Sequence, residues 1–319
     1  MPQVVHGGIS KDLILGISIT CILFAVSVFL PLVSIFSSLL LPLPVLFYRS
    51  KLGRGYGIII PLITVLGISS IIGGIQVGLA YFIGLLVLGF ALSEYLEKDL
   101  SVEKTVLYTV GTVILTGIVF LIFYNNIYGG DIIANVTKSV TKSYELTLDL
   151  YESIGIADDK IQTFSNYQES FIYYTVRIIP ALIVSLTLFI TWISLLFARP
   201  ILRNKKLFFP EFGALNLWKA PESLVWAVII CGLMLLLPDK IFKVTGLNGL
   251  IVLFIIYFFQ GVSIISFYLD KKHYPAFHRL LLYVLCLAFI PQLVAVIIIS
   301  LGFFDTWLDF RKLNVKETE

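Results

Sequence analysis

The sequence is short of charged residues. Only 13% of its 319 residues are Asp, Glu, Lys or Arg, whereas 58% are hydrophobic. About a quarter of the residues in soluble globular proteins are charged, so this composition excludes a soluble protein with an ordinary core. The net charge of +3 is small and the basic residues fall in short loops, so nucleic-acid binding has no support.

Residues that carry chemistry are also scarce. The chain has three cysteines, Cys21, Cys231 and Cys286, which lie in apolar runs without CxxC spacing and therefore predict neither a disulfide framework nor a metal site. The motifs GxSxG, HExxH, Walker A, DFG and GxGxxG are absent. We therefore predict that the protein is not an enzyme and has no cofactor. Active transport, if any, would draw on an ion gradient or a partner ATPase.

Long stretches of the chain carry no Asp, Glu, Lys, Arg or His. The runs are 13–48, 55–93, 105–130, 178–198, 223–238, 244–269 and 280–304. A bilayer core of about 30 Å is crossed by roughly 20 helical residues, because a helix satisfies its own backbone groups where water is absent. The first two runs are each too long for one crossing. Leu30-Pro31 and Gly73-Gly74 lie near their midpoints and predict that both runs fold back as hairpins.

These patterns predict an all-α fold, a polytopic transmembrane helix bundle with eight to nine crossings and one external helical hairpin. The uncertainty in the count comes from Pro291, which can turn the last run into a re-entrant or broken helix. The expected organisation is one integral membrane domain. Its parts are N-terminal transmembrane helices over 1–124, the external hairpin over 125–171, C-terminal transmembrane helices over 172–304 and a polar tail over 305–319.

Lys and Arg in short loops predict the orientation, because such loops are retained in the cytoplasm. Three basic loops agree with one another: Arg49, Lys51 and Arg54; Arg199, Arg203, Lys205, Lys206 and Lys219; Lys271, Lys272 and Arg279. They place the N-terminus in the cytoplasm. With nine crossings the basic tail would emerge outside, against the rule, whereas eight crossings would keep it inside.

A polar stretch between residues 125 and 170 interrupts the apolar runs. One face of a helix is predicted by apolar residues at spacings of four and three: Ile132, Val136, Val140, Tyr144, Leu148 and Tyr151. Gly155 should end that helix, and Asp158 can cap a second helix that carries Phe164 and Phe171. The hairpin would lie along the membrane surface or over the mouth of the bundle. A surface connection without function explains it equally well.

Five polar residues within the apolar runs are candidates for a small-solute site: Gln76, Arg177, Asn248, Gln260 and Gln292. Arg177 lies near the end of a crossing and either anchors at the interface or faces a ligand. Gln260, in the middle of its run, either bonds a neighbouring helix or contacts a solute, and the other amides share this ambiguity. In the tail, Asp305 and Asp309 share a helix face with Arg311 close enough to pair, which a solvated interfacial helix explains.

Diffuse motifs across nearly the whole chain resemble the YybS-like family of bacterial multi-pass membrane proteins, a domain of unknown function. They are Leu41-Pro42-Leu43-Pro44 followed by Arg49, Gly53, Gly55 and Gly57, then Trp218, Pro221, Trp226, Asn248, Gln260-Gly261, Asp305, Asp309 and Arg311.

That family is in turn distantly similar to the substrate-binding components of energy-coupling-factor transporters, which bind a small solute and depend on a transmembrane partner and ATPases. This resemblance implies docking through small residues on the first helix, where Gly16 and Thr20 are the nearest equivalents. The leading hypothesis is therefore a transporter-like, multi-pass protein of the bacterial cytoplasmic membrane, in contact with lipid. It would bind a small solute and rely on membrane partner subunits for energy. The alternative is a non-transporting scaffold for an envelope or division complex.

Overall fold

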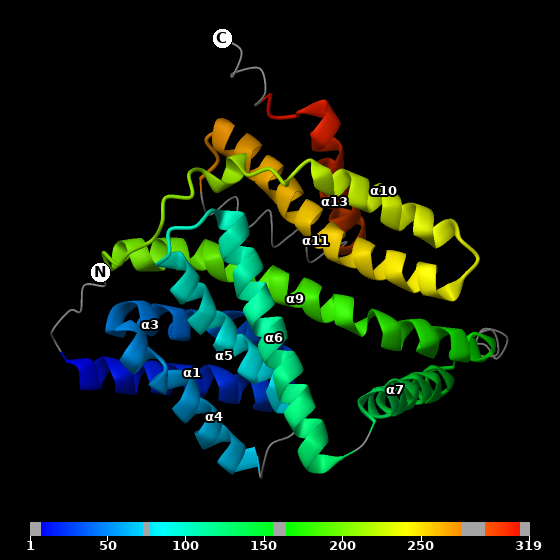
Figure 1. Ribbon diagram of the computed structural model, residues 1–319, viewed down its shortest axis with the longest axis horizontal. Helices are drawn as coiled ribbons and strands as arrows, with labels where there is room; N and C mark the ends of the chain where they lie inside the picture. Colours follow the sequence, from blue (N-terminus) through cyan, green and yellow to red (C-terminus); the bar gives the residue numbers. More distant parts are fainter. Residues whose placement is uncertain (1–7, 73–76, 130, 156–163, 276–290, 313–319) are drawn as a thin grey trace. The chain divides into compact units, whose positions relative to one another are not determined.

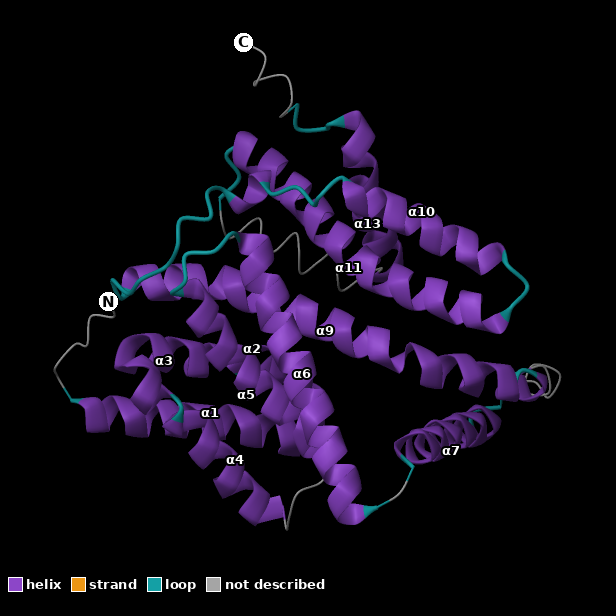
Figure 2. Cartoon of the chain, viewed as in Figure 1, coloured by secondary structure: helices purple, strands orange, loops and turns teal. Residues whose placement is uncertain are grey.

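The computed structural model describes residues 8–72, 77–129, 131–155, 164–275 and 291–312, and every regular element within those ranges is a helix (Figures 1 and 2). In chain order the helices are α1 (Ile9–Phe29), α2 (Pro31–Leu40), α3 (Pro42–Gly57), α4 (Ile59–Ile72), α5 (Val77–Leu96), α6 (Val102–Tyr128), α7 (Ile132–Ser153), α9 (Gln168–Asn204), the 3-10 helix η1 (Leu215–Leu217), α10 (Ser223–Leu236), α11 (Lys240–Lys271) and α13 (Pro291–Leu308). The predicted all-α class is confirmed.

Within the described residues, six helical segments are long and apolar enough to cross a membrane: Ile9–Phe29, Val33–Gly57, Leu79–Leu96, Val102–Ile127, Gln168–Asn204 and Lys240–Lys271. Three shorter apolar helices accompany them: Ile59–Ser70, Ser223–Leu236 and Gln292–Leu308. The multi-pass architecture is thus confirmed. The count of eight or nine crossings depends on the shorter helices, which fall below the roughly 20 residues of a full crossing, and it stays a prediction.

Pro31 divides the first apolar run as predicted. Helix α1 ends at Phe29, Leu30 takes non-helical angles (φ −119°, ψ 86°), and α2 begins with Pro31 at its first position. Proline is tolerated there because the first turn of a helix has no partner for its N–H groups in any case. The second predicted break, Gly73-Gly74, lies outside the described residues, between the end of α4 and the start of α5.

The chain divides into two compact units. The first comprises residues 1–132 and 186–212, and the second comprises residues 133–185 and 213–319, so that α9 contributes to both. In the first unit α1 packs against α2, α3 and α4, while α5 packs between α3 and α6. Glycine sets the closest approach: a Cβ atom on Gly89 of α5 would clash with the carbonyl oxygen of Pro42 on α3. Proteins use glycine where two backbones must come this near.

The second unit is built around α11, which packs against both α10 and α13. Helices α11 and α13 cross at two glycines. A Cβ on Gly261 would clash with the carbonyl oxygen of Ile298, and one on Gly302 would clash with that of Tyr257. Both obstacles are backbone atoms, which cannot move aside as a side chain can. The crossing therefore requires glycine on both helices.

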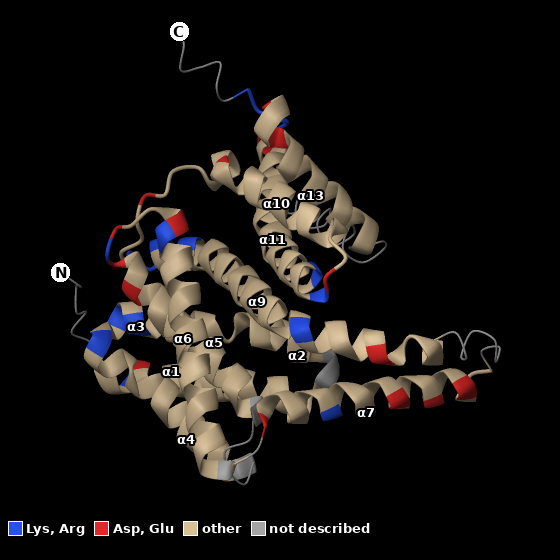
Figure 3. Ribbon diagram, turned by 45° about the vertical axis from the view of Figure 1, so that its right-hand side comes forward, with Lys and Arg blue, Asp and Glu red and all other residues tan. Residues whose placement is uncertain are grey.

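Helix α7 is the predicted amphipathic helix. It runs from Ile132 to Ser153, Gly155 follows with φ 76°, and none of its residues is buried. Its Tyr144 contacts the ring of Phe171 at 5.2 Å between centroids, and its Tyr151 contacts Phe164 at 6.0 Å. Figure 3 shows Lys (blue) and Asp and Glu (red) along α7, whereas the other helices are mostly uncharged.

Only the later part of the predicted second helix of the hairpin lies within the described residues: residues 164–166 are helical, Tyr167 is a turn, and Phe171 belongs to the next helix, α9. Asp158 lies outside the described residues, and the helix that contains Phe171 is continuous from Gln168 to Asn204. The expected boundary at residue 171 therefore falls inside α9. Pro180 and Pro200 lie within this long helix without ending it, as prolines can in membrane helices where neighbours satisfy the freed backbone groups.

Candidate functional site

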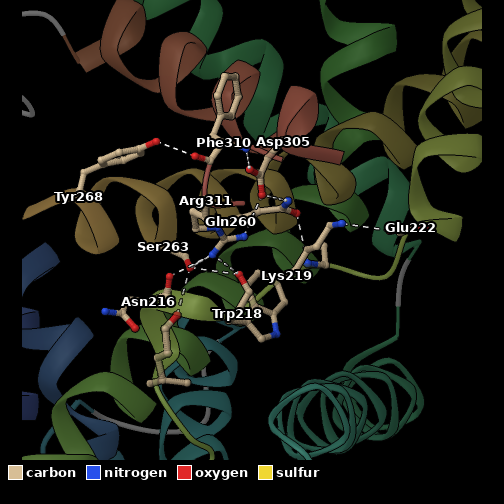
Figure 4. Close-up of polar contacts among 12 residues, drawn as sticks. Asn216, Trp218, Lys219, Glu222, Gln260, Ser263, Tyr268, Asp305, Phe310 and Arg311 are labelled. Atoms are coloured by element: carbon tan, nitrogen blue, oxygen red, sulfur yellow. Dashed lines mark hydrogen bonds and ion pairs between the residues drawn. The ribbon is translucent and has the colours of Figure 1, made fainter. Parts of the chain in front are cut away.

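Gln260 is the predicted site residue at the centre of a buried polar cluster. It lies on α11 with 0% of its surface exposed. Its Oε1 accepts a hydrogen bond from the backbone N–H of Ala220 at 3.2 Å, and its Nε2 donates to Oδ2 of Asp305 at 3.1 Å (Figure 4). Both ends of the amide are therefore bonded to the chain itself, which is the helix-to-helix contact expected of a polar residue in a bundle.

Asp305, at the end of α13, forms an ion pair with Arg311. Its Oδ2 lies 2.8 Å from Nη2 of Arg311, and the side chains are 1% and 0% exposed, respectively. The other oxygen, Oδ1, accepts a hydrogen bond from the backbone N–H of Phe310 at 2.9 Å. A buried carboxylate is tolerated when it is paired and its remaining lone pairs are bonded, which is the arrangement here.

The remaining contacts of Arg311 join the tail to the segment before α10. Its Nη1 donates to the carbonyl oxygens of Asn216 and Trp218, each at 3.0 Å, and to Oγ of Ser263 at 2.8 Å (Figure 4). We call the set Asn216, Trp218, Gln260, Ser263, Asp305 and Arg311 the polar network.

The pairing of Asp305 with Arg311 was predicted, but their placement in a solvated interfacial helix is wrong, because both are buried. The reason is a turn after α13, where Asp309 has φ 38° and sends Arg311 back toward α11. Sequence spacing shows that the two charges are near each other. It gives no sign that other segments cover them.

The polar network lies where three segments of the second unit meet. Besides the bonds from Arg311 to residues 216 and 218, the hydroxyl of Tyr268 near the end of α11 donates to the carbonyl oxygen of Phe310 at 2.6 Å. The segment before α10, the end of α11 and the tail thus occupy one end of the unit. The tail therefore lies beside the segment that contains Lys219, while the number of crossings and the orientation of the chain stay predictions.

Arg177 and Asn248 are brought together, away from Gln260. Nδ2 of Asn248 donates to the carbonyl oxygens of Arg177 at 3.1 Å and of Val244 at 2.8 Å, so it joins α11 to α9. The guanidinium of Arg177 lies over the ring of Tyr173, 3.6 Å from its centroid, and its side chain is exposed. Of the two interpretations of Arg177, this geometry favours anchoring. Asn248 and Gln260 are separated by about 18 Å along the axis of α11, at 1.5 Å per residue.

Gln76 and Gln292 are the remaining two candidates. Gln76 lies outside the described residues. Gln292 is exposed in the first turn of α13, about 20 Å along that helix from Asp305 at 1.5 Å per residue. The four candidates that the structure describes therefore do not gather at one place.

A second buried charge lies in the first unit and was missed. Arg49 was taken for a loop residue, but it belongs to α3 and is 2% exposed. It pairs with Glu94 at the end of α5, its Nη1 lies 2.5 Å from Oε1 of Glu97, and the same nitrogen donates to the carbonyl oxygen of Ser93 at 3.2 Å. The signal in the sequence for the burial of Arg49 is the presence of two acidic residues, Glu94 and Glu97, some 45 residues further along the chain.

The small residues of the first helix face inward. Thr20 is fully buried, and a Cβ on Gly16 would meet the side chains of Tyr48 and Ile60 at 2.9 and 2.8 Å. The chain's own α3 and α4 thus cover the surface that the transporter resemblance would assign to a partner.

These helices define a multi-pass integral membrane protein with buried ion pairs in both of its units. The chain belongs to the family described as predicted membrane proteins, DUF2232, which matches residues 18–306. It is 24% identical over 269 residues to the uncharacterized protein YybS of Bacillus subtilis (strain 168), covering 81% of this chain and 84% of the relative. No solved structure matches.

Proposed function

We infer that the protein is a transporter-like component of the bacterial cytoplasmic membrane that recognises a small polar solute within its second unit. The observation that carries this proposal is the polar network, in which a carboxylate, a guanidinium and an amide are buried among apolar helices. Charges inside membrane helices cost several kcal/mol and commonly mark solute or ion pathways. The sequence contains no nucleotide-binding motif, so energy would come from partner subunits or from an ion gradient.

Within this proposal Gln260 is a positioning residue. Its oxygen and its nitrogen each make a hydrogen bond, to Ala220 and to Asp305, so we assign it to holding the carboxylate in place. Asp305 and Arg311 carry the charges that a polar solute would meet. Arg177 and Asn248 would contribute to the packing of α9 on α11 instead.

Solute recognition is tested with full-length protein purified from bacterial membranes, by identifying co-purified small molecules and partner proteins by mass spectrometry. We expect a small polar compound that is lost in the Asp305→Asn variant and retained in Gln292→Leu, a change at an exposed position on the same helix. We also expect a partner ATPase with a transmembrane subunit. Stable capture of envelope-assembly proteins without any solute would refute the transport proposal.

A scaffolding role is the second candidate, and helix α7 favours it. None of its residues is buried, and Ile133, Leu146 and Leu150 are each more than half exposed. Exposed apolar residues on an amphipathic helix suit either a membrane surface or a partner protein. Replacing Leu146 and Leu150 with serine should abolish capture of envelope proteins if this candidate is correct, whereas solute binding should persist if the first one is.

A further inference from the structure

We propose that the oxygen atoms around Arg311 form a binding site for a guanidinium or ammonium group, and that this arginine occupies the site as a resident ligand. Four acceptors converge on its terminal nitrogens: the carbonyl oxygens of Asn216 and Trp218, Oγ of Ser263 and Oδ2 of Asp305. We call these four atoms the oxygen cage. The inference rests on the proposed function, because it names the class of solute as cationic and rich in N–H donors.

The oxygen cage is held in place by hydrogen bonds that do not involve Arg311. Asn216 Nδ2 donates to Oδ2 of Asp270 at 2.6 Å, and Oγ of Ser263 lies 3.1 Å from the carbonyl oxygens of both Leu215 and Trp218. Asp305 is held by its hydrogen bond from Nε2 of Gln260. The acceptors would therefore keep their positions if the arginine left, so a ligand would meet a preorganised site.

The chemistry of the oxygen cage selects its ligand. All four atoms accept hydrogen bonds, and Asp305 adds a negative charge that is 1% exposed and unpaired without a cation. A buried charge that loses its partner is strongly destabilising, so the empty cage would favour a replacement cation. An ammonium group offers three N–H donors and a guanidinium offers more, in a plane that suits a carboxylate. Anions and donor-free cations are disfavoured.

The tail can leave without unwinding α13. Helix α13 ends at Leu308, and Arg311 follows it in a turn flanked by Asp309 (φ 38°) and Lys312 (φ 53°). Positive φ values are unfavourable for residues with a side chain, so the contacts of Arg311 offset backbone strain. Its Nε is also buried without a hydrogen-bond partner in the described structure. The resident arginine is therefore an imperfect ligand, and a free solute without these costs can compete with it.

Chemical rescue tests the proposal on the full-length protein in detergent. Arg311→Ala should lower the thermal midpoint by several degrees, and methylguanidinium at millimolar concentration should restore it saturably toward the wild-type value. The wild-type midpoint should not respond in this concentration range. Tetramethylammonium, which has a charge but no N–H donor, should fail at equal ionic strength, and the Arg311→Ala variant that also carries Asp305→Asn should not be rescued. If methylguanidinium does not raise the thermal midpoint of Arg311→Ala, the proposal is wrong.

If Arg311→Ala does not fold, two conservative variants decide the question. Arg311→Lys keeps an ammonium group, whereas Arg311→Gln keeps N–H donors but loses the charge. We expect the thermal midpoint of the lysine variant to lie close to that of the wild type and the midpoint of the glutamine variant to be clearly lower. Equal midpoints would show that the site does not select a cation, and the proposal would fail.

This outcome is separable from that of the proposed function. Rescue of Arg311→Ala with no co-purified solute in the wild-type protein would leave the oxygen cage standing and count against transport. A co-purified solute without any cationic nitrogen would support transport and refute the cage.

Discussion

Replacing Gln260 with leucine isolates the hydrogen bonds of its amide, because the two side chains are similar in size and the change leaves no large cavity. The backbone N–H of Ala220 would lose its acceptor, and Asp305 would lose one donor but keep its bonds from Phe310 and Arg311. A buried donor left without a partner costs about 1–3 kcal/mol, and a typical hydrogen bond contributes about 1 kcal/mol. We therefore expect the free energy of unfolding to fall by about 2–4 kcal/mol.

The assay is equilibrium unfolding of the purified protein in mixed micelles, followed by circular dichroism. Gln292→Leu is the matched control, since it makes the same chemical change at an exposed position on α13 and should shift stability by about 0.5 kcal/mol or less. A Gln260→Leu variant as stable as this control would show that the amide does not hold α11 to its neighbours. If solute binding nevertheless disappeared in that variant, Gln260 would contact the ligand directly.

Three further predictions follow from buried charges, close helix crossings and topology. Arg49→Ala leaves two glutamates without their buried partner and should lower the free energy of unfolding by about 3–5 kcal/mol. Arg54→Ala, at a side chain that is 78% exposed, should lower it by less than about 1 kcal/mol. Equal losses in the two variants would contradict the pairing. Gly302→Ala should destabilise the second unit by about 1–3 kcal/mol because its Cβ meets backbone atoms, while Gly232→Ala, with open space around it, should be neutral or stabilising in the same assay. Activity reporters fused at the C-terminus and between α9 and α10 should report the same side of the membrane, and opposite sides would contradict the contacts of the tail.

Local patterns were enough to predict several elements. Composition placed the chain in the membrane, Leu30-Pro31 ended α1, and the spacing of apolar residues predicted α7. Each of these depends on residues that are neighbours in sequence, because helix length, proline geometry and amphipathic spacing act within a few turns. The break at Gly73-Gly74 stays a prediction.

The candidate site was less accessible from the sequence. Among five polar candidates, Gln260 lies in the polar network, and the sequence could not separate it from Gln292, which is exposed. Asp305 and Arg311 looked like solvated tail residues, and Arg49 looked like part of a loop. Each owes its role to a segment about 45 or more residues away, such as the bond between Gln260 and Asp305.

The sequence by itself determined that this chain is helical, crosses the membrane several times and carries one amphipathic helix outside the apolar runs. Only the tertiary structure decided which polar groups are buried, which partners neutralise them and that the tail returns to the segment before α10. The physical reason is that most of these helices are apolar on every side, so no stripe distinguishes the face toward lipid from the face toward other helices. Packing between segments distant in sequence decides which helix faces contact other helices, and the glycine crossings and buried ion pairs mark such contacts.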